Sequence, residues 1–469
     1  TPTPIRVGRE CPTPTEFVAT GTNGSVTVNN SVGVRTVSGR ITDQFGAGIN
    51  QVTVDVTGGA TLSVLTDASG NYTFSVPAGT SVTITPKAIN KTWPTGWAFH
   101  VNGVTSFDAA VMLQRATNIV PSGWVLPWDD IAADVDKSAD GKPCTPLQLT
   151  SVDVQALQRL ITQQILDLSQ YSQASWRFIP KSHVFGTCPF SPQFPESLTL
   201  TVNVNTTAQD FTGVKIGDVV SPTGAVPTML NGEPAIENRN GDKLVFEVAD
   251  RALAAGEQYT IPFQAKDFAD LMAFQMTLAF DADKLEVVDV AGGALANMSK
   301  SAFGLRNKEQ GAVNMAWFNA RPTSVDNGTE VFFVTVKAKQ AVSSLQELIQ
   351  ATSTFTKAEA YTMEEVKSVQ IDVQKLPTTV VEGDQFKLLQ NVPNPFGDET
   401  LIRFYLPEAG AVNLTIMDAT GKVVRVMKGD FQRGVNEITF VNQGLSGGVY
   451  YYQLSTERHS AIKRMVITQ

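Results

Sequence analysis

Short runs in which apolar and polar residues alternate recur along this chain of 469 residues, and they are clearest near its C-terminal end. Two such sets of apolar residues are Ile402, Phe404 and Leu406, and Val412, Leu414 and Ile416. Each set places its apolar side chains on one face of a β-strand. Turn residues follow at 418–421 (Asp-Ala-Thr-Gly) and at Gly447-Gly448. The pattern predicts a small antiparallel sandwich over residues 386–469.

The same segment carries three further motifs. It opens with Leu389-Gln390-Asn391-Val392-Pro393-Asn394-Pro395-Phe396, contains Gly447-Gly448-Val449-Tyr450-Tyr451-Tyr452, and closes with Lys463-Arg464-Met465-Val466-Ile467. The two prolines favour extended backbone, so the opening should be a stiff connector. In this order the motifs resemble the C-terminal sorting domain of proteins that the type IX secretion system of Bacteroidetes exports. The resemblance implies a secreted or cell-surface protein that meets the secretion machinery through residues 386–469.

Composition excludes several classes of protein. The net charge is -9 and no basic block interrupts the acidic background, so we do not expect nucleic acid as a main partner. No apolar run reaches the roughly 18 to 20 residues that a membrane span needs. The chain begins Thr1-Pro2-Thr3-Pro4, without a signal-peptide pattern, so we expect any signal peptide to be removed or to lie outside this sequence. The length suggests about three or four domains.

Residues 37–88 consist of short β-prone runs separated by glycine turns. The runs at 37–43 (VSGRITD) and 66–74 (TDASGNYTF) resemble the carboxypeptidase regulatory-like module, a β-sandwich that usually serves as a spacer. The preceding arm, residues 1–36, has strand character without a domain of its own. We expect it to complete a sheet edge, either in its own subunit or in a neighbouring one.

Residues 89–221 contain one pattern twice, at 104–115 and 149–161. In each copy a serine is expected to cap a helix, an aspartate follows two residues later, and apolar residues recur at i, i+3 and i+4. The repeat resembles the duplicated calcium loop and helix of dockerins. In the first copy Asp108 suits the last ligand position, but Trp97, Phe99 and Val101 stand where the other ligands belong.

The second copy is the better candidate for calcium. A loop of this type places oxygen ligands at positions 1, 3, 5 and 12 and a glycine at position 6. The candidate ligands are Asp136, Ser138, Asp140 and Asp153, with Asp134 just outside the loop. Gly141 stands at position 6, but about six extra residues around 143–146 separate it from the last ligand. The alternative is that Asp108 and Asp153 serve only as helix-start residues.

The chain has three cysteines. Cys144 and Cys188 lie in loops of the same module, and in an exported protein we expect them to form a disulfide, with two free thiols as the alternative. Cys11 is then left over. His183 is near Cys188 in sequence, but a nucleophilic pair would also need an orienting group and a pocket. No P-loop, dinucleotide fingerprint or zinc-protease motif is present, so we expect no enzymatic activity.

Residues 244–374 alternate strands and turns in a jelly-roll-like pattern. Within them, 273–281 (AFQMTLAFD) and the following Leu285-Glu286 resemble a cohesin. Cohesins bind dockerins, so the chain is expected to hold both halves of a recognition pair. The polar segment 222–243 would be a flexible linker with an r.m.s. reach of roughly 25 Å. That reach favours pairing within one molecule over pairing between molecules.

We therefore predict a mainly β protein, a string of β-sandwich domains with one small α-helical module. The expected division is an arm at 1–36, a sandwich at 37–88, the repeat module at 89–221, a linker at 222–243, the cohesin-like domain at 244–374, a linker at 375–385 and the sorting domain at 386–469. The function expected is structural or adhesive, with protein partners and with calcium as the one expected cofactor. Two alternatives remain, a subunit of a self-assembling extracellular filament, that is, a homopolymer, and a carbohydrate- or matrix-binding accessory protein.

Overall fold

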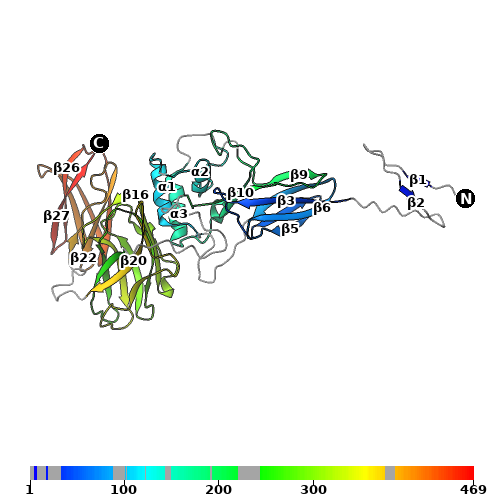
Figure 1. The fold of residues 1–469 in the computed structure, drawn as a ribbon. Helices are drawn as coiled ribbons and strands as arrows, with labels where there is room; N and C mark the ends of the chain where they lie inside the picture. Colours follow the sequence, from blue (N-terminus) through cyan, green and yellow to red (C-terminus); the bar gives the residue numbers. More distant parts are fainter. Residues whose placement is uncertain are drawn as a thin grey trace.

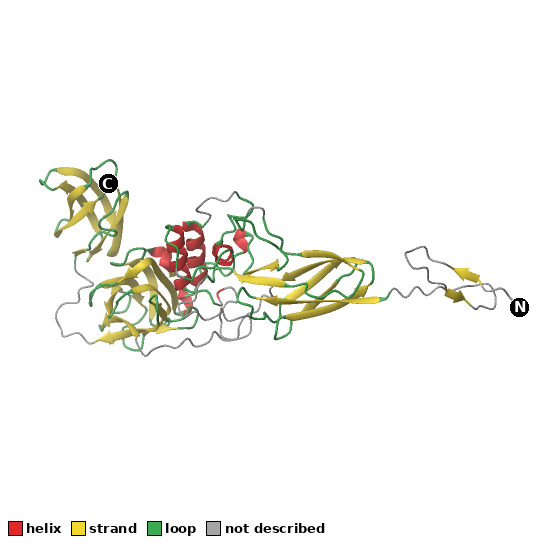
Figure 2. Ribbon diagram, turned by 45° about the horizontal axis from the view of Figure 1, so that its top comes forward, coloured by secondary structure: helices red, strands yellow, loops and turns green. Residues whose placement is uncertain are grey.

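The computed structural model describes residues 33–87, 101–142 except 102 and 122, 149–219 except 191 and 192, 243–374, and 386–468. It also describes two short antiparallel strands in the arm, β1 (Ile5–Val7) and β2 (Phe17–Ala19). The expected linker at 375–385, and the one at 222–243 apart from its last residue, lie outside the described residues. The described part is mainly β-sheet with three α-helices, which confirms the predicted fold class (Figures 1 and 2).

The first sandwich is built from eight strands. They are β3 (Val34–Thr42), β4 (Thr53–Gly58), β5 (Leu62–Leu65), β6 (Asn71–Pro77), β7 (Thr80–Lys87), β8 (Trp176–Pro180), β9 (Leu198–Val202) and β10 (Phe211–Lys215). One sheet has the order β6-β3-β10-β8 and the other β5-β4-β7-β9. Alternate residues such as Val54 and Val56 point into the shared core. The chain therefore leaves this sandwich after β7 and returns to complete it.

This return differs from the expected division at residue 88. Segment 176–215, which was expected to belong to the repeat module, supplies β9 beside β7 and β10 beside β3. The helices are thus inserted into the sandwich. Backbone hydrogen bonding explains the difference, because β3 and β7 would otherwise present open edges.

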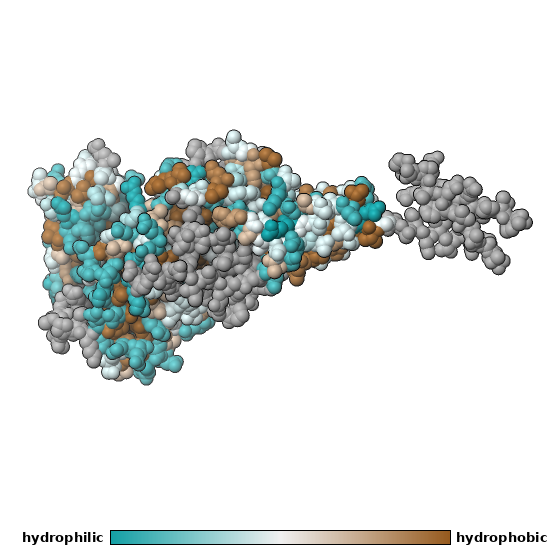
Figure 3. Space-filling model, viewed as in Figure 1, coloured by the Kyte–Doolittle hydropathy of each residue, from teal (hydrophilic) through white to brown (hydrophobic). Residues whose placement is uncertain are grey.

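The inserted helices are α1 (Ser106–Ala116), α2 (Trp128–Ala133) and α3 (Ser151–Ile161). The N-cap residues are Thr105 and Thr150, each one position before the serine that was expected to cap. Around them, the loop between α1 and α2 exposes Val120, Val125 and Leu126, and apolar side chains gather there on the surface (Figure 3).

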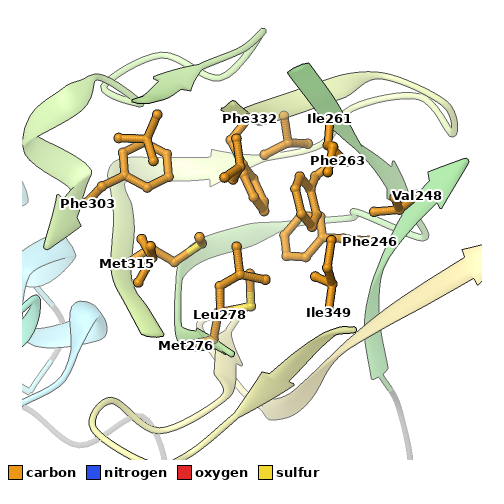
Figure 4. Packing of buried hydrophobic residues seen from close by; sticks show 14 of the residues in the cluster. Phe246, Val248, Ile261, Phe263, Met276, Leu278, Phe303, Met315, Phe332 and Ile349 are labelled. Carbon is orange, nitrogen blue, oxygen red and sulfur yellow. The ribbon is translucent and has the colours of Figure 1, made fainter. Parts of the chain in front are cut away.

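The third unit is a jelly-roll of ten strands. They are β11 (Lys243–Ala249), β12 (Gln258–Lys266), β13 (Leu271–Phe280), β14 (Leu285–Gly292), β15 (Phe303–Gly304), β16 (Ala312–Thr323), β17 (Glu330–Ala338), β18 (Ile349–Thr352), β19 (Glu359–Tyr361) and β20 (Val366–Gln374). Its order is β14-β17-β12-β11-β20-β19-β13-β16-β15, with β18 beside β13. Aromatic rings fill the interior, where Phe263 stacks on Phe332 with centroids 4.3 Å apart (Figure 4).

The C-terminal unit is a two-sheet sandwich, as predicted. Its strands are β21 (Lys387–Leu388), β22 (Glu399–Leu406), β23 (Gly410–Asp418), β24 (Val423–Phe431), β25 (Gly434–Val441), β26 (Gly448–Ser455) and β27 (Ser460–Ile467). The sheets have the orders β21-β22-β25 and β24-β23-β26-β27. The helices lie between the first sandwich and the jelly-roll, and the C-terminal sandwich packs against the jelly-roll (Figure 1).

Candidate cation site and helix-binding face

The helices α1 and α3 begin with the same arrangement of hydrogen bonds. Oδ2 of Asp108 accepts from the backbone N–H and the hydroxyl of Thr105, both at 2.8 Å. Oδ2 of Asp153 accepts from the same groups of Thr150, at 2.9 and 3.1 Å. These are capping boxes, which satisfy amides left open at a helix start. Both aspartates therefore are helix-start residues, and only their second oxygens are left for another role.

Those second oxygens have different surroundings. Oδ1 of Asp108 accepts from the backbone N–H of Val219 at 2.9 Å. Oδ1 of Asp153 accepts from the backbone N–H of Asp136 at 3.1 Å, which brings the loop before α3 onto the helix start.

Three of the five predicted ligands lie together at the second loop. Asp134, Asp136 and Asp153 can each offer an oxygen such that all three lie within 4.8 Å of one another. Asp134 is 3% exposed, and its Oδ2 has no hydrogen-bond partner among the described residues. A buried carboxylate oxygen without a partner is costly when ionised. A proton or a cation at this oxygen would remove that cost.

The pKa values of Asp134 and Asp153 also reflect the cost of ionising these carboxylates. Burial, together with the nearby carboxylates of Asp153, Asp140 and Asp136, raises the pKa of Asp134 to about 7. Burial, together with the nearby carboxylate of Asp136, likewise raises the pKa of Asp153 to about 6. A bound cation would reverse both shifts, because it favours the ionised carboxylate.

Asp140 makes a different contact. It accepts two hydrogen bonds from Arg177 on β8, at 2.9 and 3.0 Å. The Arg177 side chain is 1% exposed, also pairs with Glu196 at 2.7 Å, and lies over the ring of Phe194. Asp140 thus joins the loop to the first sandwich.

The other loop positions shape the turn. The backbone N–H of Ser138 donates to Oδ1 of Asp136 at 2.8 Å. Gly141, which was expected at position 6 of the loop, has φ +73°, a left-handed conformation that glycine adopts without strain. Asp134, Asp136 and Asp153 are therefore the residues that would hold a cation. Their hard oxygen donors suit calcium, which takes six to eight oxygen ligands in total.

A buried basic side chain interacts with Asp108, the aspartate at the helix start of the first copy. Lys215, at the end of β10, is 5% exposed. Burial lowers its pKa to about 7, while Asp218 and Asp108 act in the opposite direction. Sequence reasoning missed Lys215 because β10 comes close to the helices only once it completes the first sandwich.

The predicted disulfide partners are only half described. Cys188 is buried in the core of the helical module, and Cys144 lies outside the described residues. Nearby, the backbone N–H of Gly141 donates to the carbonyl of Phe190 at 3.0 Å, so the two chain segments run close together. The Cys144–Cys188 pairing stays a prediction, and Cys11 is outside the described residues as well.

The helices dock on one outer face of the jelly-roll, formed by β13 and β16. Three of the polar contacts across this boundary involve these two strands. The backbone N–H of Ser106 donates to Gln275 Oε1 at 2.7 Å, Gln114 Nε2 to the carbonyl of Ala320 at 2.9 Å, and Gln158 Nε2 to the carbonyl of Ala316 at 3.0 Å. All the glutamines involved are buried.

Apolar packing accompanies these bonds. Phe107 of α1 lies 5.8 Å from Tyr361 between ring centroids, and Ala273 and Ala316 are fully buried beneath the helices. At Gly304 a Cβ atom would stand 1.7 Å from the carbonyl oxygen of Thr162, so the close approach requires glycine there. The helices and the jelly-roll share one continuous core.

The C-terminal end of α3 and the residues after it also form hydrogen bonds with the jelly-roll. Thr356 donates its hydroxyl hydrogen to the carbonyl of Ile161 at 2.9 Å, and Asn307 Nδ2 donates to Gln163 Oε1 at 3.1 Å. Gln164 Nε2 donates to the carbonyl of Ser301 at 2.8 Å. The contact therefore continues from Gln158 past the C-terminal end of α3.

Comparison with known proteins assigns two of these units. Residues 244–374 match the cohesin domain family, and residues 392–468 match the secretion system C-terminal sorting domain family. The jelly-roll is a cohesin domain, and the C-terminal sandwich is the sorting domain of the type IX secretion system. The protein is thus exported to the cell surface or the extracellular space. The resemblances predicted for 37–88 and 89–221 remain predictions.

Similar solved structures are cohesins. A type I cohesin–dockerin complex from Clostridium thermocellum shares 10% identity over 28% of this chain and 100% of that chain, with a TM-score of 0.23. A type II cohesin from Bacteroides cellulosolvens shares 15% over 29% of this chain and 98% of its own, with a TM-score of 0.22. A type II cohesin dyad from Acetivibrio cellulolyticus shares 12% over 48% of this chain and 77% of its own, with a TM-score of 0.21.

No curated protein matches the chain. Within the described residues, every helix is too short or too polar to cross a membrane.

Proposed function

We infer that this protein is a non-enzymatic structural or adhesive component of the cell exterior whose cohesin domain is held by the helices of its own chain. The observation that carries the inference is the shared core between α1, α3 and the cohesin strands β13 and β16. Cohesin domains bind dockerins, and the duplicated capping boxes of α1 and α3 support a dockerin-like role for the helical module. The cohesin domain and the helical module would then bind each other within one molecule.

A cation at Asp134, Asp136 and Asp153 supports this arrangement. The three carboxylates lie at the start of α3, and α3 carries the contacts to Ala316, Thr356 and Asn307. Neutralising them stabilises the helix start and the docked state together. Calcium is the cation that we propose, because the available donors are all oxygen atoms.

Analytical ultracentrifugation and negative-stain imaging, with and without a calcium chelator, test this function. We expect particles of one chain each at all concentrations, more compact with calcium than with chelator. Filaments or concentration-dependent oligomers would instead support the homopolymer alternative, built from contacts between molecules.

A further inference from the structure

Strand β22 of the sorting domain has two buried faces. Ile402 and Phe404 point into the domain's own core, whereas Arg403 and Tyr405, which alternate with them, are 3% and 2% exposed. Side chains at alternate positions of a strand lie on opposite faces of the sheet. Arg403 and Tyr405 are therefore buried by something outside the sorting domain's core, and that neighbour is the cohesin domain.

Arg403 is the polar anchor of this contact. Its guanidinium donates to the carbonyl of Gly293 at 2.7 Å and to the carbonyl of Met298 at 2.9 Å, both in the cohesin loop after β14. Glu437, on the neighbouring strand β25, lies 3.5 Å from Nε and supplies the counter-charge. Nη1 and Nη2 of the buried arginine each have a carbonyl acceptor, whereas its Nε has no hydrogen-bond partner among the described residues and has only the counter-charge of Glu437 beside it.

Tyr405 is the apolar anchor. Its ring meets Phe333 of β17 edge to face, with centroids 5.1 Å apart. Ala291 is buried in the same cluster, and Leu389 and Val435 pack around it. The neighbouring Phe332 points into the cohesin core, so β17 is buried on both faces.

Ion pairs lie around this cluster. Lys387 contacts Glu330 at 2.9 Å, and Arg433 contacts Glu257 at 3.5 Å. An aromatic and an arginine at the centre with charged pairs at the rim is the arrangement of a specific protein interface.

We propose that the sorting domain is a lasting structural part of the folded protein and stays bound to the cohesin domain when the connector at 375–385 is cut. After cleavage of the connector, noncovalent contacts alone would hold the sorting domain on the cohesin domain. The sheet β24-β23-β26-β27, on the other side of the sorting domain, is left for contacts with the secretion machinery. The cohesin face that binds the sorting domain differs from the face that binds the helices. An experiment can therefore disprove either contact without bearing on the other.

A full-length chain with a protease recognition sequence inserted into 375–385 tests the proposal. After complete cleavage, we expect both fragments to elute together from a gel-filtration column at micromolar concentration. Arg403→Ala in the sorting domain and Phe333→Asp in the cohesin domain should each weaken the association by about tenfold or more. Arg464→Ala, at an exposed arginine of β27, is the matched control and should have no effect.

Two results would overturn the proposal. The first is separation of the wild-type fragments while both retain folded circular dichroism spectra. The second is an association that neither Arg403→Ala nor Phe333→Asp weakens, because the fragments would then be joined by another surface. Using one variant in each domain guards against a single substitution that merely unfolds its own domain.

Discussion

Asp140 and Arg177 are joined by two parallel hydrogen bonds, at 2.9 and 3.0 Å, between a loop of the helical module and a strand of the first sandwich. Residue type and spacing had suggested Asp140 as a calcium ligand. Its carboxylate instead balances a buried arginine. The structure therefore separates two kinds of aspartate in one loop, those facing each other and the one facing Arg177.

This separation predicts different effects of two matched substitutions. Asp134→Asn should abolish the calcium-induced rise in melting temperature, because it removes a charge from the cluster. Asp140→Asn should lower the melting temperature, because Arg177 loses its partner, yet keep the calcium-induced rise. Differential scanning calorimetry with calcium and with chelator measures both. Equal calcium responses in the two variants would argue against the cluster as the binding site.

We expect Asp129 to make the stability of the folded protein depend on pH, independently of the three carboxylates of the cation cluster. It accepts hydrogen bonds from the backbone N–H of Val125 at 2.6 Å and from Gln44 Nε2 at 3.1 Å, and burial raises its pKa from 3.8 to about 7. Since the folded state holds this proton more tightly than the unfolded state, the stabilising contribution is complete below about pH 4 and is lost as pH rises through about 7.

Asp129→Asn should therefore flatten the pH dependence of unfolding. Between pH 5 and pH 8, denaturant titrations in saturating calcium should show the free energy of unfolding of the wild type falling relative to that of the variant. An identical slope in the two proteins would mean that Asp129 titrates normally in the folded state.

The hydrogen bond from Gln158 to the carbonyl of Ala316 should contribute measurably to the docking of α3 on the cohesin domain. Gln158→Leu removes the hydrogen bond to the buried carbonyl of Ala316 and should lower the free energy of unfolding by about 1 to 3 kcal/mol. Gln155→Leu, on the exposed side of the same helix, is the control and should change stability by less than about 0.5 kcal/mol. Comparable losses in both variants would show that α3 is not docked through this face.

The alternation of apolar residues was enough to predict a sandwich at 386–469 and a jelly-roll at 244–374, since their strands pair mainly with neighbours inside the same segment, and the motifs within them indicated the two families. It was not enough for the first sandwich. Alternation in 198–202 predicts a strand but does not say that its partner is β7, more than a hundred residues earlier. The pairing is decided by open sheet edges in three dimensions.

The residues around the candidate cation site could likewise be predicted only in part. Asp134, Asp136 and Asp153 could be found from loop spacing, but the roles of Arg177 and Lys215 depend on strands that return late in the chain. One signal was available and unused. The run Val331-Phe332-Phe333-Val334 is apolar without alternation, as in strands buried on both faces, and it marks the cohesin face that the sorting domain covers.

In the proposed function, the helices and the cohesin face that they cover belong to the same molecule. A photo-crosslinking amino acid at Gln164, whose side chain reaches the carbonyl of Ser301, tests this in an equal mixture of isotopically heavy and light chains. Mass spectrometry of the crosslinked peptides should show heavy helix peptides joined only to heavy cohesin peptides, and light only to light. A substantial share of mixed heavy–light pairs would contradict docking within one chain.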